Sequence, residues 1–148
     1  MSISIFKILC ECDNANLGVT NEGGIYSTFI NNTGTSVKGT IAIASTSVEN
    51  GVDIAPASSG MPIGIIYESG IPNGSEVKVV VCGKAQVLLA TSSTATKGFW
   101  CGVSSVAGRM IQMSTTATVI SENCAHIGHS LQTITAAGSL AYVQLQFN

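Results

Sequence analysis

The sequence has few charged side chains, and this shortage excludes several classes of protein. Only 9% of the 148 residues are Asp, Glu, Lys or Arg, against roughly 25% in an ordinary soluble domain. Six basic and eight acidic residues leave a net charge of −2. Proteins that bind nucleic acids need a surplus of cations to neutralise phosphates. We therefore expect no nucleic-acid partner.

Long apolar runs and targeting signals are also missing. No apolar run approaches the ~20 residues of a membrane span, so we expect no membrane partner. The opening residues MSISIFKILCEC have neither the basic flank nor the small-residue cleavage site of a secretory signal. We therefore expect synthesis in the cytoplasm. The high apolar content of 45% argues against disorder.

Catalytic motifs are absent as well, and the few reactive side chains are poorly placed. There is no GxSxG, P-loop, GxGxxG or HExxH motif. The two histidines, His126 and His129, are three apart and would point to opposite faces of a strand. Ser130 follows His129 directly, so these two side chains would also point apart. We expect no enzyme, no catalytic residues, no metal and no cofactor.

The five cysteines are interpreted as free thiols that act as small buried apolar side chains. They are Cys10, Cys12, Cys82, Cys101 and Cys124. An alternative is a metal site, since Cys10-x-Cys12 and Cys124-x-His126 each place two ligands on one face of a strand. The paired knuckles of structural zinc sites are missing, so we favour the first interpretation.

Serine and threonine take the place of charge, and apolar residues alternate with them in short runs. The chain has 18 serines and 14 threonines. Period-two alternation, β-branched residues and intervening turns predict strands. The expected strands are Ser2–Cys10, Gly39–Ala44, Pro62–Tyr67, Glu76–Cys82, Lys84–Ala90, Phe99–Val103, Arg109–Met113, Thr116–Ile120, His126–Leu131 and Leu140–Phe147. This pattern predicts an all-β fold, a small antiparallel barrel or sandwich.

An internal repeat is the most specific feature of the sequence. Ile63-Gly64 precedes Gly74-Ser75 and then Val77, Val79 and Val81. The same order recurs 64 residues later, as Ile127-Gly128, Gly138-Ser139, Ala141, Val143 and Leu145. Each copy predicts a hairpin whose glycines allow a bulge, a positive φ or a close backbone contact. We expect the two similar hairpins to close one barrel.

The N-terminal stretch differs from the rest, because it shows no clean alternation after Cys12. We divide the chain into residues 1–30, an N-terminal arm or an edge strand, and residues 31–148, a single β domain. An arm can add as a strand to a partner's sheet edge. Trp100, in the single aromatic cluster Phe99-Trp100, is our interface candidate; a core tryptophan is the alternative.

The order of these motifs resembles a family of small virion proteins of tailed phages. Four segments carry the resemblance, which covers residues 31–148. They are Asn32–Gly34 with Lys38–Ile41, Pro62–Ile65 with Gly74–Val79 and Gly83–Ala85, Thr94–Gly98 with Ser104–Gly108, and His126–Leu131 with Ala137–Ser139 and Val143–Leu145. The family is the head decoration, or capsid cement, proteins. One departure is Phe99, which stands where the family has an acidic residue after Lys-Gly.

The resemblance implies a structural virion protein made in the host cytoplasm. It would bind the major capsid protein on the outer capsid surface, as a homotrimer, and stabilise the mature head. The arm would dock on the capsid by strand addition, with Ile3, Ile5, Phe6, Ile8 and Leu9 as capsid-binding anchors. An alternative is a head-fibre or tail-associated module that contacts host surface glycans. A small hydrolase with a hydroxyl nucleophile is a third hypothesis, for which no base is placed.

Overall fold

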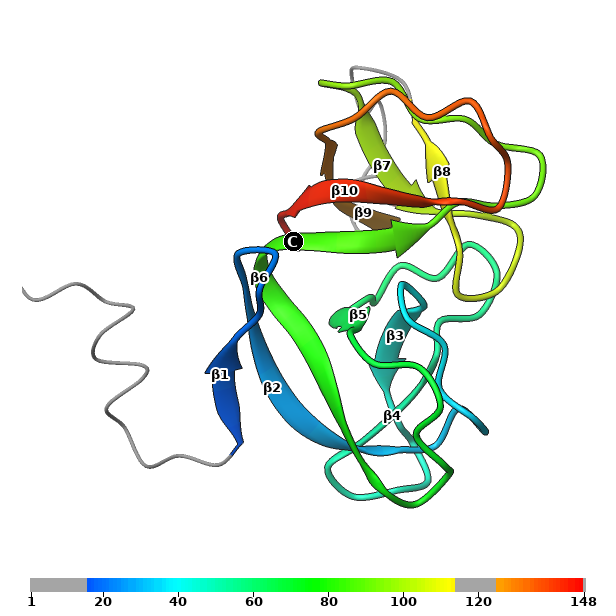
Figure 1. Cartoon of the computed structure of the whole chain (residues 1–148). Coiled ribbons are helices and arrows are strands. Elements are labelled where there is room, and N and C mark those ends of the chain that lie inside the picture. Colours follow the sequence, from blue (N-terminus) through cyan, green and yellow to red (C-terminus); the bar gives the residue numbers. More distant parts are fainter. Residues whose placement is uncertain (1–15, 114–124, 148) are drawn as a thin grey trace, which may run out of the picture.

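The computed structural model describes residues 16–113 and 125–147, and these residues form ten β-strands (Figure 1). The strands are β1 (Leu17–Val19), β2 (Gly24–Asn31), β3 (Ile41–Ala44), β4 (Gly51–Ile54), β5 (Gly64–Ile66), β6 (Glu76–Leu88), β7 (Trp100–Val103), β8 (Met110–Gln112), β9 (His126–Ser130) and β10 (Leu140–Leu145). They make one sheet in which every pairing except β2–β4 is antiparallel. The predicted all-β fold is confirmed.

Most predicted strands are found within a residue or two of their expected limits. The two runs Glu76–Cys82 and Lys84–Ala90 are one strand, β6, which continues through Gly83 at a φ of 83°. The strands β1, β2 and β4 were not predicted. The expected strands Ser2–Cys10 and Thr116–Ile120 lie outside the described residues. No helix of the described chain is long and apolar enough to span a membrane.

Five strands close into a ring in the lower half of Figure 1. The order is β2, β4, β3, β5 and the first part of β6, which returns to pair with β2. The interior is filled by one apolar cluster, whose buried members are Ala42, Val52, Ile66, Val77 and Val79. We call this arrangement the first ring.

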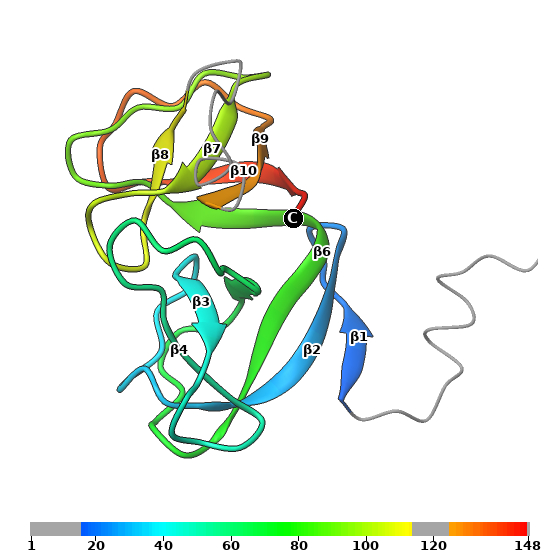
Figure 2. The same ribbon diagram turned by 180° about the vertical axis from the view of Figure 1, so that it is seen from behind.

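A second ring lies above the first and uses the other half of β6 (Figures 1 and 2). Its order is β6, β10, β9, β7 and β8. A parallel bridge between Leu89 and Met110 connects β8 back to the residue after β6. The backbone N–H of Ala90 also donates to the Met110 carbonyl, at 2.9 Å. Strand β6 therefore belongs to both rings.

The two rings are copies of one five-stranded unit, because every strand pairing in the first has an equivalent in the second. Residues of β2 and β4 match residues 58 positions later, those of β3 match at 59, and those of β5 and early β6 match at 64. Each paired position in the first ring has a counterpart in the second. The counterparts, with the first ring given first, are Ala42–Gly64 with Cys101–Gly128, Ile65–Val80 with His129–Gln144, Phe29–Val77 with Val87–Ala141, Ala42–Ile54 with Cys101–Gln112, and Asn31–Val52 with Leu89–Met110.

The repeat found in the sequence is therefore real and extends further than expected. Its two hairpins, β5–β6 and β9–β10, have the same register, since Ile66 faces Val79 and Ser130 faces Val143. We had expected the two hairpins to close one barrel together, and this expectation is wrong. Each belongs to its own ring, because the long strand β6 ends one unit and begins the next.

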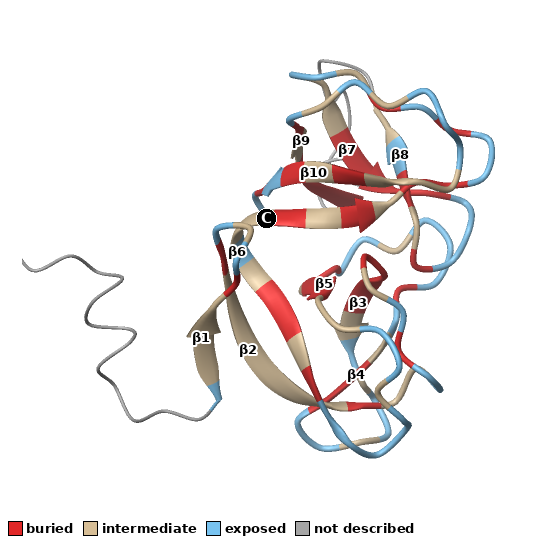
Figure 3. Cartoon of the chain, viewed as in Figure 1, coloured by how far each residue is buried: buried red, intermediate tan, exposed pale blue. Residues whose placement is uncertain are grey.

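The rings pack end to end, and the contact buries apolar side chains of the first ring. Figure 3 shows buried residues in β3 and β5. Ile41, Ala55, Ile65 and Val80 are at most 1% exposed and belong to the same core cluster as the interior of the second ring. The backbone N–H of Ile41 donates to the Gly108 carbonyl at 2.9 Å. Burial of this apolar surface holds the two units together.

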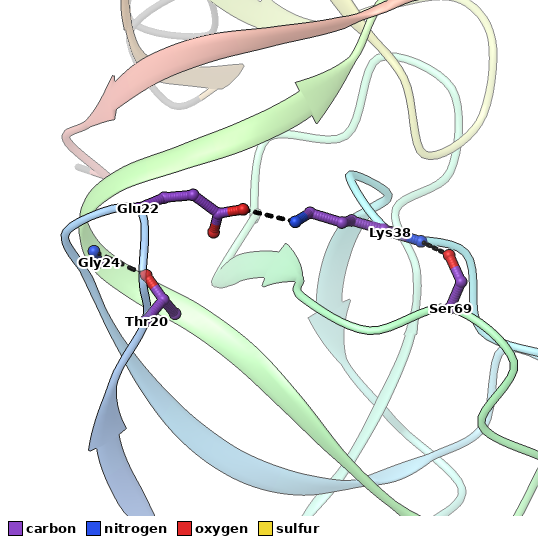
Figure 4. Close-up of polar contacts among 5 residues, drawn as sticks. All are labelled: Thr20, Glu22, Gly24, Lys38 and Ser69. Atoms are coloured by element: carbon purple, nitrogen blue, oxygen red, sulfur yellow. Dashed lines mark hydrogen bonds and ion pairs between the residues drawn. The ribbon is translucent and has the colours of Figure 1, made fainter.

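The N-terminal part of the described chain is built into the sheet. Strand β1 lies at the sheet edge and pairs with β2, whereas β2 is an interior strand of the first ring. Figure 4 shows how the turn between them is fixed. The Glu22 carboxylate contacts Lys38 Nζ at 2.5 Å, and the Gly24 N–H donates to Thr20 Oγ1 at 2.9 Å. Residues 17–31 are thus anchored to the first ring.

Candidate binding surface

Trp100 lies at the start of β7, and its indole contacts both histidine rings of the chain. Its ring centroid is 4.6 Å from that of His126, and the two rings are nearly parallel, with an interplanar angle of 18°. The His129 centroid is 3.7 Å away on a ring tilted by 38°. The indole is half-buried rather than enclosed. Stacked aromatic rings of this kind form a rigid apolar surface.

The structure corrects our expectation that the two histidines point to opposite faces, since both rings contact Trp100. The physical reason is an irregularity in the β7–β9 pairing. Trp100 pairs with His129 and Cys101 with Gly128, but Gly102 pairs with His126. The extra residue in β9 interrupts the alternation of side chains.

Ser130 does not form a base–nucleophile pair with His129, in agreement with the sequence analysis. Its side chain is 1% exposed. The hydroxyl donates to the Gln132 carbonyl at 2.7 Å and thereby fixes the turn after β9. A nucleophile needs a hydrogen bond to its base, and this hydroxyl is used structurally instead.

The remaining predicted site residues cannot be placed. The anchors Ile3, Ile5, Phe6, Ile8 and Leu9 lie outside the described residues, as do Cys10, Cys12 and Cys124. Within residues 16–113 and 125–147, no three His, Cys, Asp or Glu side chains are grouped as metal ligands. The described cysteines are both free thiols. Cys101 is buried, as interpreted, but Cys82 is exposed, so the interpretation as a buried side chain is wrong there.

The surface also carries large apolar side chains that the sequence did not single out. Met61 is 75% exposed and Val37 is 52% exposed. The others, between 38% and 45% exposed, are Ile54, Val106, Ile111 and Leu131. Their exposure depends on which face of a short strand or loop meets the other ring, and alternation alone does not specify this.

The two described thiols are expected to differ in reactivity. Burial raises the pKa of Cys101 to about 11, outweighing a backbone hydrogen bond that lowers it. A shift of two pKa units reduces the thiolate fraction about a hundredfold. In the folded protein at pH 8, iodoacetamide should alkylate exposed Cys82 much faster than buried Cys101, whose thiolate fraction is lowered. Peptide mass spectrometry measures both rates; similar rates in the folded protein would contradict the burial of Cys101, and urea should equalise them.

Comparison with protein-family models and with curated proteins found no match to this chain.

Proposed function

We propose that this chain is a structural virion protein that binds the outer surface of an assembled phage capsid as a trimer and stabilises the mature head. The proposal starts from the resemblance carried by residues 31–148. The observation that supports it best is the pair of rings joined by β6. A short rigid body with few charges can be covered by neighbouring proteins at low desolvation cost.

Such a body stabilises a shell by preferential binding. A protein that binds only the expanded lattice shifts the equilibrium toward that lattice by mass action. A trimer that touches several capsid subunits gains further strength, because each added contact is effectively intramolecular. Neither mechanism requires chemistry at the surface, which agrees with the structural use of the Ser130 hydroxyl.

The sheet edge at β1 supports docking through the N-terminal segment. In the described part of the chain, β1 pairs with β2 only, so its other edge is open to a further strand. Residues 1–15 connect directly to this edge through Asn16, whose carbonyl accepts a hydrogen bond from the Thr28 N–H at 2.8 Å. Strand addition supplies affinity through the backbone and specificity through alternate side chains.

Deleting residues 1–15 should abolish binding to heads while the rings remain folded. Asn16 is kept because its carbonyl holds β2. Burying two of the five predicted anchors contributes about 3 kcal/mol, so affinity should fall about a hundredfold or more. The measurement is occupancy on heads of the encoding phage by quantitative gel or cryo-electron microscopy, with circular dichroism to confirm the fold.

A full-length control separates the anchors from chain length. Replacing Ile3, Ile5, Phe6, Ile8 and Leu9 together by serine should have the same effect as the deletion. Heads that lack the protein should also rupture at lower temperature than decorated heads. Full occupancy by the deletion variant would refute the role of the arm. Unchanged head stability, together with glycan binding by the isolated protein, would instead support the fibre or tail alternative.

A further inference from the structure

The contact between the two rings joins two different faces of the repeated unit. The first ring contributes its upper face, which we define as Gly39, Thr40, Ile41, Ala55, Ile65 and Val80. The second ring contributes its lower face, which we define as Leu88, the turn residues Val106, Ala107 and Gly108, and Leu140. Leu88 and Leu140 lie against Gly39, and Gly108 lies against Thr40. The contact is therefore head to tail.

Because each ring is a copy of the same unit, each face has an equivalent that this contact does not use. The equivalent upper face of the second ring consists of Gly98, Phe99, Trp100, Met113, His129 and Gln144. The equivalent lower face of the first ring consists of Ile30, Val48, Glu49, Asn50 and Glu76. Figure 1 shows β7, which begins at Trp100, in the upper half of the molecule, and the end of β2 with the start of β6 at the bottom.

The two upper faces differ in burial, as expected if a neighbouring ring covers only the upper face of the first ring. Ile41 and Ile65 are at most 1% exposed, whereas their equivalents Trp100 and His129 are only half-buried. Gly39 is buried and its equivalent Gly98 is exposed. The open upper face also carries aromatic side chains, whereas the covered face has none. Aromatic residues are enriched at the centres of interfaces.

The two open faces are complementary in charge. Lys97 is exposed beside Gly98, while Glu49 and Glu76 are exposed on the lower face of the first ring. In the contact within the chain, Leu140 packs against Gly39. The equivalent pair would place Glu76 beside Gly98 and therefore close to Lys97. Opposite charges at this position favour the encounter and fix its orientation.

We propose that a second copy of this chain binds the upper face of the second ring through the lower face of its first ring. The copies then associate head to tail, repeating the contact between their own rings. Asn50 already accepts a hydrogen bond from the Ile30 N–H at 2.8 Å, so the seam repeats side-chain packing rather than backbone bonds. The inference deepens the proposed function and rests on it only for the number of subunits.

Charge exchange in the full-length chain tests the seam. Lys97→Glu and Glu76→Lys each place like charges together, so each variant should associate about tenfold more weakly than the natural sequence. The double variant restores opposite charges and should associate as the natural chain does. An equimolar mixture of the two single variants should also associate, because each open end meets a partner of opposite charge. Sedimentation velocity over a concentration series measures all of these.

Gln146, exposed at the end of β10 and outside both faces, provides the control. Gln146→Glu and Gln146→Lys should leave association unchanged. A natural chain that stays monomeric at millimolar concentration would overturn the inference, as would single variants that associate normally or a double variant that fails to recover. Occupancy on heads is measured separately, so the proposed function can survive the loss of this seam.

Discussion

Replacing Gly128 by alanine should lower the free energy of unfolding by about 4 kcal/mol, from overpacking and backbone strain together. A Cβ atom at this position would meet the backbone of β10, most closely the Gln144 carbonyl oxygen, at 1.9 Å. The backbone φ of 145° is one that side-chain-bearing residues rarely adopt. The strands β9 and β10 would have to separate, and their pairing holds the second ring together. Urea denaturation followed by circular dichroism measures the loss.

Gly138→Ala is the matched control, since it also has a positive φ, of 73°, but lies in open space. Its nearest neighbour would be an Arg109 nitrogen at 3.9 Å. We expect a loss of about 1 kcal/mol, from backbone strain alone. Equal losses for the two variants would show that close packing of β9 against β10 is not what Gly128 provides.

Replacing Asn31 by leucine should cost about 3 kcal/mol, because it removes four hydrogen bonds made by a buried side chain. The Asn31 side chain is fully buried. Its amide donates to the carbonyls of Gly34 and Ile71, at 2.7 and 2.9 Å. Its oxygen accepts hydrogen bonds from the Thr33 N–H and hydroxyl. One side chain thus holds together two loops at the lower end of the first ring.

The second ring shows why the substitution is informative. The residue equivalent to Asn31 is Leu89, which is also fully buried and belongs to the apolar core. A leucine side chain therefore fits this position of the repeated unit. The two positions differ in the hydrogen bonds that the Asn31 side chain makes. Asn73→Ala removes an exposed amide that accepts from the Gly34 N–H at 3.1 Å, and it should cost less than about 1 kcal/mol. If Asn31→Leu is as mild as this control, the buried hydrogen bonds contribute little.

Sequence patterns predicted the strands that have one apolar face. Alternation identified the runs that become β3, β5, β6, β7, β8, β9 and β10 within small limits. It failed for β2, in which Ile25, Tyr26, Phe29 and Ile30 fall on both faces and all are half-buried. Strand β4 is short, and no strand was expected over its residues. Its place is set by its neighbours rather than by its own sequence.

The duplication was only half visible in the sequence, and this limited the prediction of the binding surface. The 64-residue offset is marked by repeated glycines such as Gly64 and Gly128. The earlier strands match at 58 or 59 residues and share few side chains: Asn31 corresponds to Leu89 and Ile41 to Trp100. Trp100 was identified by residue type, whereas His126 and His129 were wrongly expected to point to opposite faces of the strand. The bulge in β9 could not be predicted from the alternation of apolar and polar side chains, because the extra residue interrupts that alternation.

The strand β6 has a consequence for how the molecule responds to force and to cleavage. The first part of its 13 residues completes the first ring, and the last part begins the second. Cutting the chain at Gly83 would therefore leave each fragment with the five strands of its own ring. In the intact chain, a pull applied to both ends would be transmitted from one ring to the other through this one strand.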